Sequence, residues 1–204
     1  MSELVNHNYK SIWLQENLGF VKATNLGIKA GKSEYVILQN NDTEVTDGWI
    51  DRLMKPILAG DFVAAGPMTN TDGSWQGWKN VKNTVITDLP DLTNMSADEA
   101  SKILFEKYKY SARDVKMVAF YCTLFKRSVF DEIGLLDEVF KVGFGDDDDF
   151  CMRIKNAGHL IAFVPSAYIL HHHRTTFKSV FREEKVKEMQ DINLEIFRKK
   201  HKLI

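Results

Sequence analysis

The chain has 204 residues, 44% of them hydrophobic and 27% charged, an ordinary globular composition that excludes a disordered or fibrous chain. This length suits one domain, which we take to span residues 1–204. With 27 Lys and Arg against 28 Asp and Glu the net charge is −1, so the composition gives no indication of a nucleic-acid partner.

Short apolar runs alternate with helical patterns along the chain, as they do in α/β proteins. A helix is predicted over 17–30, since Asn17 is a suitable N-cap and Gly31 a suitable stop. The apolar run 35–39 predicts a buried strand that leads directly into Asn40. Three more elements are predicted from the same patterns: strands over 11–15 and 62–65, and a helix from about residue 48.

The segment 68–95 is rich in Asn, Thr, Asp and Gly and also holds Trp75 and Trp78. It is too long for a bare connection, so we expect a functional loop or a small hairpin. Ser96 and Glu99 then form a capping box that predicts the start of a helix. The remaining expected elements are a strand over 115–125, helices over 128–133 and 146–157, strands over 160–164 and 168–170 on either side of Pro165, and an amphipathic helix over 178–204.

Asn40, Asn41 and Asp42 follow the end of the predicted strand 35–39. Ligands of α/β proteins bind beyond the carboxyl ends of strands. A carboxylate beside short amides is a suitable ligand set for a hard divalent cation that also holds phosphate oxygens. The alternative is a polar turn, because Asn and Asp often bond their own backbone.

Four consecutive carboxylates, Asp146 to Asp149, open the predicted helix 146–157. Negative charge is favourable at a helix N-terminus, but helix geometry directs the four side chains differently, so they cannot all serve one site. Their repulsion is expected to raise the pKa of at least one carboxyl, as a general base working near neutral pH requires. The alternative is a solvated acidic helix start.

Three histidines, His171 to His173, follow the predicted strand 168–170. In an extended segment alternate side chains share a face, so His171 and His173 are expected to lie opposite His172. One of them is a candidate to complete a metal site begun by Asp42. The alternative is a polar surface loop.

Together these segments resemble family 2 glycosyltransferases, which have the GT-A fold. The stretches that carry the resemblance occur in the family's order over 17–177. The first two are NLGFVKATNLGI from Asn17, like the family's NxGFxxAxNxGI, and NNDTEV from Asn40 with GWI from Gly48, like the local form of the DxD motif. The next two are GLLDEVF from Gly134, like GxxDExF, and GDDDDFCMR from Gly145, like EDxDLCxR with Asp146 in place of Glu. The last is VPSA from Val164 with His171 beyond, like VPxA…H.

The resemblance implies a mixed central sheet flanked by helices, in an N-terminally truncated form of the GT-A fold. Family members begin with a strand–helix–strand unit that holds the nucleotide base and ribose, whereas sixteen residues precede Asn17 here. We therefore expect the sheet edge beside 11–15 or 35–39 to lack its usual neighbours. An exposed edge favours pairing with another chain, so we expect self-association, pairing with a missing N-terminal segment, or covering of the edge by residues 1–10.

The activity that the resemblance implies is metal-dependent, inverting transfer of a sugar from a nucleotide-sugar donor to a hydroxyl of a glycan or lipid-linked acceptor, as in polysaccharide synthesis. It implies Mn²⁺ or Mg²⁺ held by Asp42 and His171, and Asp147 as the general base. The other residues expected at the site are Asn25, Asn40 and Asn41 at the donor diphosphate, and Asp146, Asp149, Trp75 and Trp78 on the acceptor side or in support.

Two other functions are alternatives. One is a catalytically silent GT-A-like module that binds a partner. The other is a metal-dependent hydrolase, which the amides of Asn40 and Asn41 disfavour because two-metal sites need more carboxylates.

The first ten residues lack the apolar core of a signal peptide, and no apolar run approaches the length of a membrane span. We therefore expect a cytoplasmic protein. The basic residues from Arg198 to Lys202 indicate either a solvated helix end or a weak contact with an anionic membrane surface, which would make the protein peripheral to the membrane.

Overall fold

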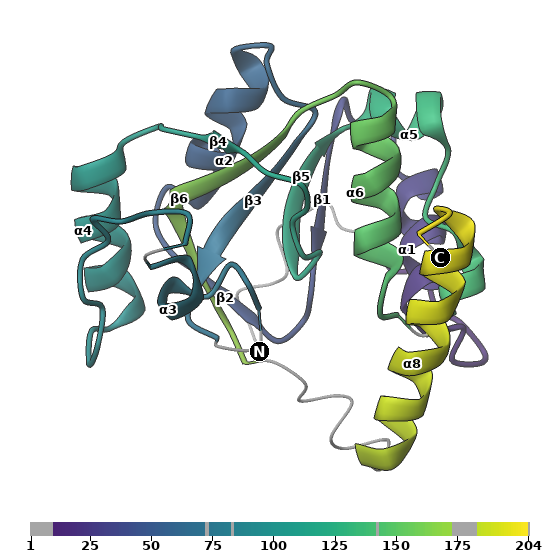
Figure 1. The fold of residues 1–204 in the computed structure, drawn as a ribbon. Coiled ribbons are helices and arrows are strands. Elements are labelled where there is room, and N and C mark those ends of the chain that lie inside the picture. Colours follow the sequence, from purple (N-terminus) through teal and green to yellow (C-terminus); the bar gives the residue numbers. More distant parts are fainter. Residues whose placement is uncertain (1–9, 72–73, 83, 142, 173–182, 204) are drawn as a thin grey trace.

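The computed structural model describes residues 10–71, 74–82, 84–141, 143–172 and 183–203 (Figure 1). The strands are β1 (Tyr35–Gln39), β2 (Thr43–Val45), β3 (Ala64–Thr69), β4 (Arg113–Asp114), β5 (Cys122–Lys126) and β6 (Ile161–His171). The helices are α1 (Gly19–Ala30), α2 (Trp49–Leu58), α3 (Trp78–Val81), α4 (Ala97–Tyr108), α5 (Arg127–Ile133), α6 (Asp146–Asn156) and α8 (Glu183–Lys200), with a 3-10 turn, η2, at Glu138–Phe140.

The strands form one mixed sheet in the order β1-β5-β3-β6-β2, and β4 also pairs with β6. The pair β3 and β6 is parallel, whereas the other strand pairs are antiparallel. The sheet with flanking helices confirms the expected α/β class. The carboxyl ends of β3 and β6 and the first turn of α6 face the same, lower side of the molecule in Figure 1.

Successive residues of one strand pack against helices on opposite faces of the sheet. Phe125 of β5 packs with Phe150 of α6, in the layer that also holds α1 and α5. Its neighbour Leu124 packs with Leu53 of α2 on the other face. The helices α3 and α4 pack around Phe163 of β6. Burial on both faces explains why these strands read as nearly continuous apolar runs.

The predicted strand 11–15 is wrong. Residues 10–14 have no regular secondary structure, and Trp13 is 92% exposed. An apolar run becomes a strand only where another strand supplies its hydrogen bonds, and no strand of the described part pairs with this one. The predicted helix begins at Gly19 rather than at Asn17, whose side-chain oxygen accepts a hydrogen bond from the N–H of Gly19 at 2.9 Å.

Other predicted bounds also change. The segment 115–125 forms a strand only from Cys122, and β3 extends past its predicted end to Thr69. Pro165 does not divide two strands, because β6 is continuous and its register against β3 shifts opposite this point. The described part of 68–95 contains the short helix α3 rather than a hairpin.

The strand β1 lies at an edge of the sheet, since it pairs only with β5 among the described strands. This agrees with the open edge expected at 35–39, whereas residues 1–9, one of its expected covers, lie outside the described residues. The predicted helix 178–204 is described from Glu183, and Asn193 lies on its buried face. None of the described helices is long and apolar enough to cross a membrane.

Candidate functional site

Asp42 and His171 lie together although 129 positions separate them. Asp42 sits in the turn between β1 and β2, and His171 is the last residue of β6. Pairing of β2 with β6 brings them together, with the N–H of His172 donating to the carbonyl of Asp42 at 2.9 Å. As a result, Nε2 of His171 is 3.2 Å from Oδ1 of Asp42, and both side chains are largely buried.

Two residues that the sequence did not single out hold His171 in place. The ring of Tyr121 stacks on the imidazole, with centroids 5.0 Å apart. The side-chain oxygen of Asn70, just beyond β3, accepts a hydrogen bond from the backbone N–H of His171 at 2.8 Å. The hydroxyl of Tyr121 donates to the carbonyl of Pro67 at 2.7 Å, which fixes the tyrosine in turn.

The surroundings favour a neutral imidazole. Burial lowers the pKa of His171, and the nearby Asp42 carboxylate offsets only part of this effect. A neutral imidazole beside a carboxylate is a donor pair that suits Mn²⁺ or a similar divalent ion. The described residues hold no group of three or more His, Cys, Asp or Glu side chains able to enclose a metal. Such an ion would therefore keep positions for ligands from elsewhere, such as phosphate oxygens.

Asn25, Asn40 and Asn41, the three amides expected at the donor diphosphate, differ in burial and in contacts. Asn41 is exposed in the turn beside Asp42, and Asn40 is half-buried with its N–H bonded to the carbonyl of Tyr121 at 2.8 Å. Asn25 is 3% exposed, and its side chain bonds to both the N–H and the carbonyl of Leu136. The structure therefore does not bring Asn25 together with Asp42; the contacts of Asn25 tie α1 to the chain before η2.

The acidic turn at the start of α6, Asp146 to Asp149, contains buried carboxyls. Asp146 is 4% exposed, and burial, followed by repulsion from Asp148 and Asp149, raises its pKa to about 6. Asp147 is half-buried, and burial together with the neighbouring carboxylates holds its pKa well above the ordinary value. A carboxyl with a raised pKa is suited to proton transfer near neutral pH.

The contacts of Asp149 join two helices rather than leave its carboxylate open to a ligand. Its carboxylate is fully buried and lies 3.0 Å from Nε of Arg153, 2.7 Å from Nζ of Lys200 and 2.8 Å from Nε2 of His201. Lys200 is the last residue of α8 and His201 follows it directly. Asp149 therefore supports the acidic turn by joining α6 to α8.

The two tryptophans expected near the acceptor differ. Trp78 is 8% exposed inside the core around α3 and α4, so its ring has no open face for stacking on a sugar, and that expectation is corrected. Trp75 is half-buried with its ring centroid 5.3 Å from that of Phe163. Its Nε1 is buried and has no hydrogen-bond partner within the part of the chain that is described.

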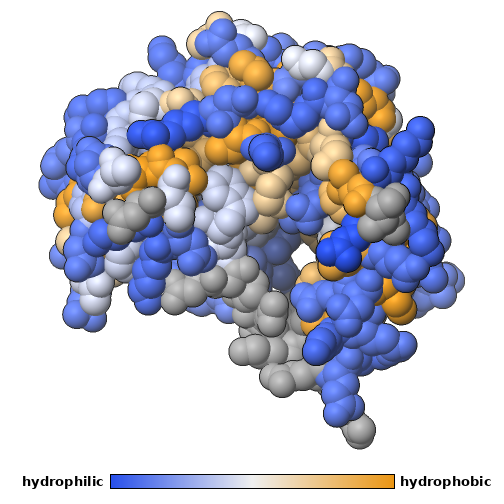
Figure 2. Space-filling view, in the orientation of Figure 1, coloured by the Kyte–Doolittle hydropathy of each residue, from blue (hydrophilic) through white to orange (hydrophobic). Residues whose placement is uncertain are grey.

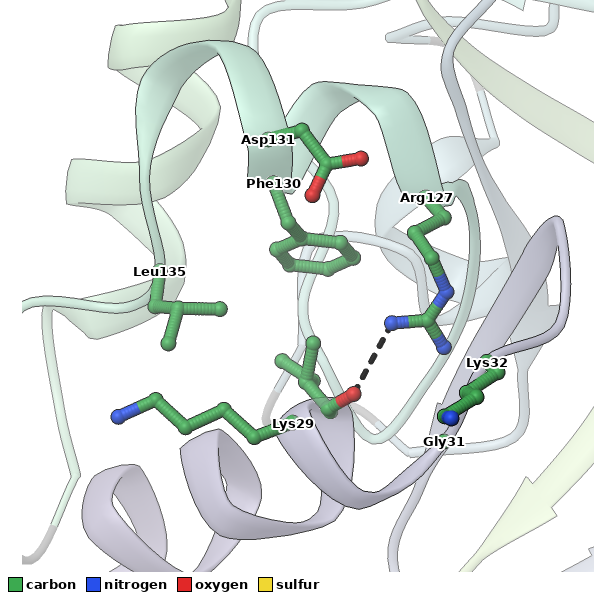
Figure 3. A pocket seen from close by; sticks show the side chains of 8 residues that line it. Lys29, Gly31, Lys32, Arg127, Phe130, Asp131 and Leu135 are labelled. Atoms are coloured by element: carbon green, nitrogen blue, oxygen red, sulfur yellow. Dashed lines mark hydrogen bonds between the residues drawn. The ribbon is translucent and has the colours of Figure 1, made fainter.

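A shallow cleft of about 470 Å³ lies at the other end of β1, where α1 ends and α5 begins (Figure 3). Lys29, Lys32 and Arg127 surround its polar side, and Arg127 donates to the carbonyl of Ile28 at 2.9 Å. Because Arg127 adjoins the start of β1 and Asp42 follows its end, this cleft is separate from the Asp42 and His171 pair. A different recess is visible in Figure 2, between the lobe with α3 and α4 and the helix α8.

Comparisons with known proteins agree with this architecture. Residues 2–134 match the model of glycosyl transferase family 2. Rv1525 of Mycobacterium tuberculosis and Mb1552 of Mycobacterium bovis are each 27% identical over 173 residues, which cover 81% of this chain and 58% of theirs. The chain thus spans somewhat over half the length of these curated relatives.

The structure is also similar to a solved glycosyltransferase, GalNAc-T7 in complex with UDP, GalNAc and Mn²⁺. The TM-score is 0.56 at 17% sequence identity, and the match covers 78% of this chain and 31% of the other. This likeness establishes the GT-A type of fold.

Proposed function

The chain belongs to glycosyl transferase family 2, and from this premise we propose that it transfers a sugar from a nucleotide-sugar donor to an acceptor hydroxyl with inversion. The observation that carries the proposal is the pair formed by Asp42 and His171 at 3.2 Å. It lies at the carboxyl ends of β1 and β6, the edge of the sheet at which α/β proteins bind ligands. Two stretches that resemble motifs of the family, far apart in the sequence, thereby meet at one point.

Asp42 and His171 would hold Mn²⁺ or Mg²⁺; the carboxylate fits either ion, whereas the neutral imidazole suits a transition-metal ion such as Mn²⁺ better than Mg²⁺. When bound, such an ion stabilises the negative charge that develops on the leaving diphosphate. The exposed Asn41 next to Asp42 would donate from its amide to a phosphate oxygen. GalNAc-T7, the solved structure with a similar fold, was crystallised with UDP and Mn²⁺.

Asp147 is the proposed general base. It accepts the proton of the acceptor hydroxyl while the acceptor oxygen forms a bond to the anomeric carbon. At the same time the bond between that carbon and the diphosphate oxygen breaks, and the diphosphate leaves with the electron pair. The raised pKa of Asp147 suits this role because it makes the carboxylate more basic than a free aspartate.

We further propose a glycan or lipid-linked acceptor and a cytoplasmic location, with residues 1–204 acting as one catalytic domain. The basic end of α8, including Arg198 and Lys199, would allow contact with an anionic membrane surface. Self-association through the edge strand β1 belongs to the same proposal, because that strand pairs on one side only among the described strands.

The test is a thermal-shift screen of nucleotide-sugars, each with and without Mn²⁺, followed by an assay for nucleoside diphosphate release. We expect one donor to raise the melting temperature only when Mn²⁺ is present, and to be turned over with a suitable acceptor. Donor stabilisation without turnover across a panel of glycan and lipid-linked acceptors would instead indicate a silent binding module. Equal stabilisation with and without Mn²⁺ contradicts the proposed metal site.

A further inference from the structure

We propose that α8 acts as a positioning element for the acidic turn, and that Asn193 is the residue that fixes the backbone from which Asp146 and Asp147 extend. The inference rests on the proposed function, in which Asp147 takes the acceptor proton. It adds a residue from the C-terminal helix, which lies outside the part of the chain that matches the family model, residues 2–134.

The loop that leads into α6 has an unusual backbone. Gly143, Phe144 and Gly145 have φ angles of +119°, +71° and +86°. Glycine adopts this left-handed region readily, but for Phe144 it is strained. Three such residues in a row keep one shape only where surrounding contacts hold them. The direction of Asp146, the next residue, depends on that shape.

Asn193 supplies contacts of this kind. Its side chain is on the buried face of α8, and the residue is 7% exposed. The amide nitrogen Nδ2 donates to the carbonyl of Gly143 at 2.7 Å and to the carbonyl of Phe140 at 3.2 Å. One amide therefore uses both of its hydrogens to bridge the two sides of the turn before Asp146. Without the Asn193 amide, the carbonyl of Gly143 would lose this hydrogen bond, and a buried carbonyl without a partner is unfavourable.

Charged contacts hold α8 against both flanks of this loop. Lys200 lies 2.6 Å from Oδ2 of Asp137, which precedes the loop, and 2.7 Å from Oδ1 of Asp149, which follows it. His201 adds a contact of 2.8 Å to the same oxygen of Asp149. The apolar residues Ile196 and Phe197 pack on the core that includes Phe150. In Figure 1 the helix α8 lies beside α1 and α6, consistent with these contacts.

The first test measures the backbone without any substrate. Asn193→Ala removes the amide, whereas Asn193→Asp keeps its shape but places an oxygen against the two carbonyl oxygens. We expect hydrogen–deuterium exchange of amides 143–150 to quicken at least about tenfold in both variants, while β3 and β6 are unchanged. The control, Leu194→Ala, alters a neighbouring side chain that is 44% exposed and should leave the exchange unchanged. Wild-type exchange rates in both Asn193 variants overturn the proposal.

The second test separates positioning from a loss of stability. With the donor found in the thermal-shift screen, we expect kcat of both variants to fall about 10- to 100-fold, because misplacement of a catalytic group by about 1 Å has effects of this size. The KM for the donor and the shift of the melting temperature caused by Mn²⁺ with the donor should stay close to those of Leu194→Ala. A wild-type kcat, or a loss confined to KM, overturns the positioning role. If Asp147→Asn retains full turnover, the role of Asp147 as the general base fails, whereas the exchange experiment still decides whether Asn193 fixes the loop.

Discussion

The ring of Tyr121 stacks on the imidazole of His171, with 5.0 Å between centroids and 14° between the ring planes. The backbone carbonyl of Tyr121 accepts the N–H of Asn40 at 2.8 Å, and its hydroxyl donates to the carbonyl of Pro67 at 2.7 Å. One buried tyrosine thus contacts both the end of β6 and the turn that carries Asp42. Residues that orient a metal-binding imidazole affect the affinity for the metal as well as the fold.

Replacement of Tyr121 by leucine removes this stacking and should weaken binding of Mn²⁺ about tenfold or more, because the imidazole of His171 loses its orientation. Tyr121→Phe is the matched variant, since it keeps the ring and loses only the hydroxyl, which bonds to Pro67 and Thr69. We expect it to retain most of the Mn²⁺ affinity and to lose about 1 kcal/mol of unfolding free energy. Calorimetric titration with Mn²⁺, with and without a nucleoside diphosphate, measures the Mn²⁺ affinity of both variants. Equal affinities for the leucine variant and wild type contradict the role of Tyr121.

Asp42→Ala should abolish the stabilisation by a nucleoside diphosphate that depends on Mn²⁺, since the variant lacks the carboxylate that is the proposed ligand. Glu44→Ala, in the adjacent strand β2, is the control. Glu44 pairs with His172 at 2.7 Å on the exposed side of β2, so its loss should leave the stabilisation unchanged. Melting temperatures with and without Mn²⁺ decide the matter, and similar shifts for the two variants would remove Asp42 from the metal site.

Local sequence patterns predicted the elements whose partners are nearby or whose capping is explicit. The capping box of Ser96 and Glu99 is present, and α6 begins at Asp146 as expected. The strand at 11–15 failed because an apolar run cannot indicate whether another strand lies beside it. Pro165 was misjudged for a similar reason, since a proline inside a strand is tolerated where the register shifts, and the shift depends on β3.

The candidate site shows the same limit. Asp42 and His171 were predicted as partners from their residue types and motifs, and the pairing of β2 with β6 places them together. Tyr121 and Asn193 were missed as contributors to the site, because each acts through contacts with residues distant in sequence. A tyrosine before a strand and an asparagine within an amphipathic helix carry no local signal for these roles. Trp78 was misjudged because residue type alone does not separate a core ring from an exposed one.

Asp146 should lower the free energy of unfolding as the pH rises. Its pKa is raised from 3.8 to about 6, first by burial. Between these values the native state holds more protons than the unfolded state, so the free energy of unfolding falls as the pH rises. Asp146→Asn removes this effect and should raise the unfolding free energy by about 3 kcal/mol at pH 7 and by little at pH 4.

Urea denaturation of the wild type and Asp146→Asn at both pH values checks this prediction. Asp61→Asn, which removes an exposed carboxylate from the loop before β3, is the control and should change stability by about 0.5 kcal/mol or less. A gain for Asp146→Asn at pH 7 no larger than that of the control would show that the buried carboxyl carries no such penalty.

Asp147 and Asp148 are adjacent carboxyls for which we expect opposite results. Burial and repulsion hold the pKa of Asp147 well above its ordinary value, and its Oδ1 accepts the N–H of Asp148 at 3.0 Å. Asp147→Asn has nearly the same shape but cannot take the acceptor's proton, so kcat should fall by about 10²- to 10⁴-fold with folding and donor binding intact. Asp148 points elsewhere on the helix, since successive helical side chains diverge by about 100°, and Asp148→Asn should change kcat little.

The measurement is kcat for both variants with a donor that the wild type turns over, beside their melting temperatures. Small and equal losses would mean that the acidic turn serves only as the first turn of α6, where negative charge is favourable.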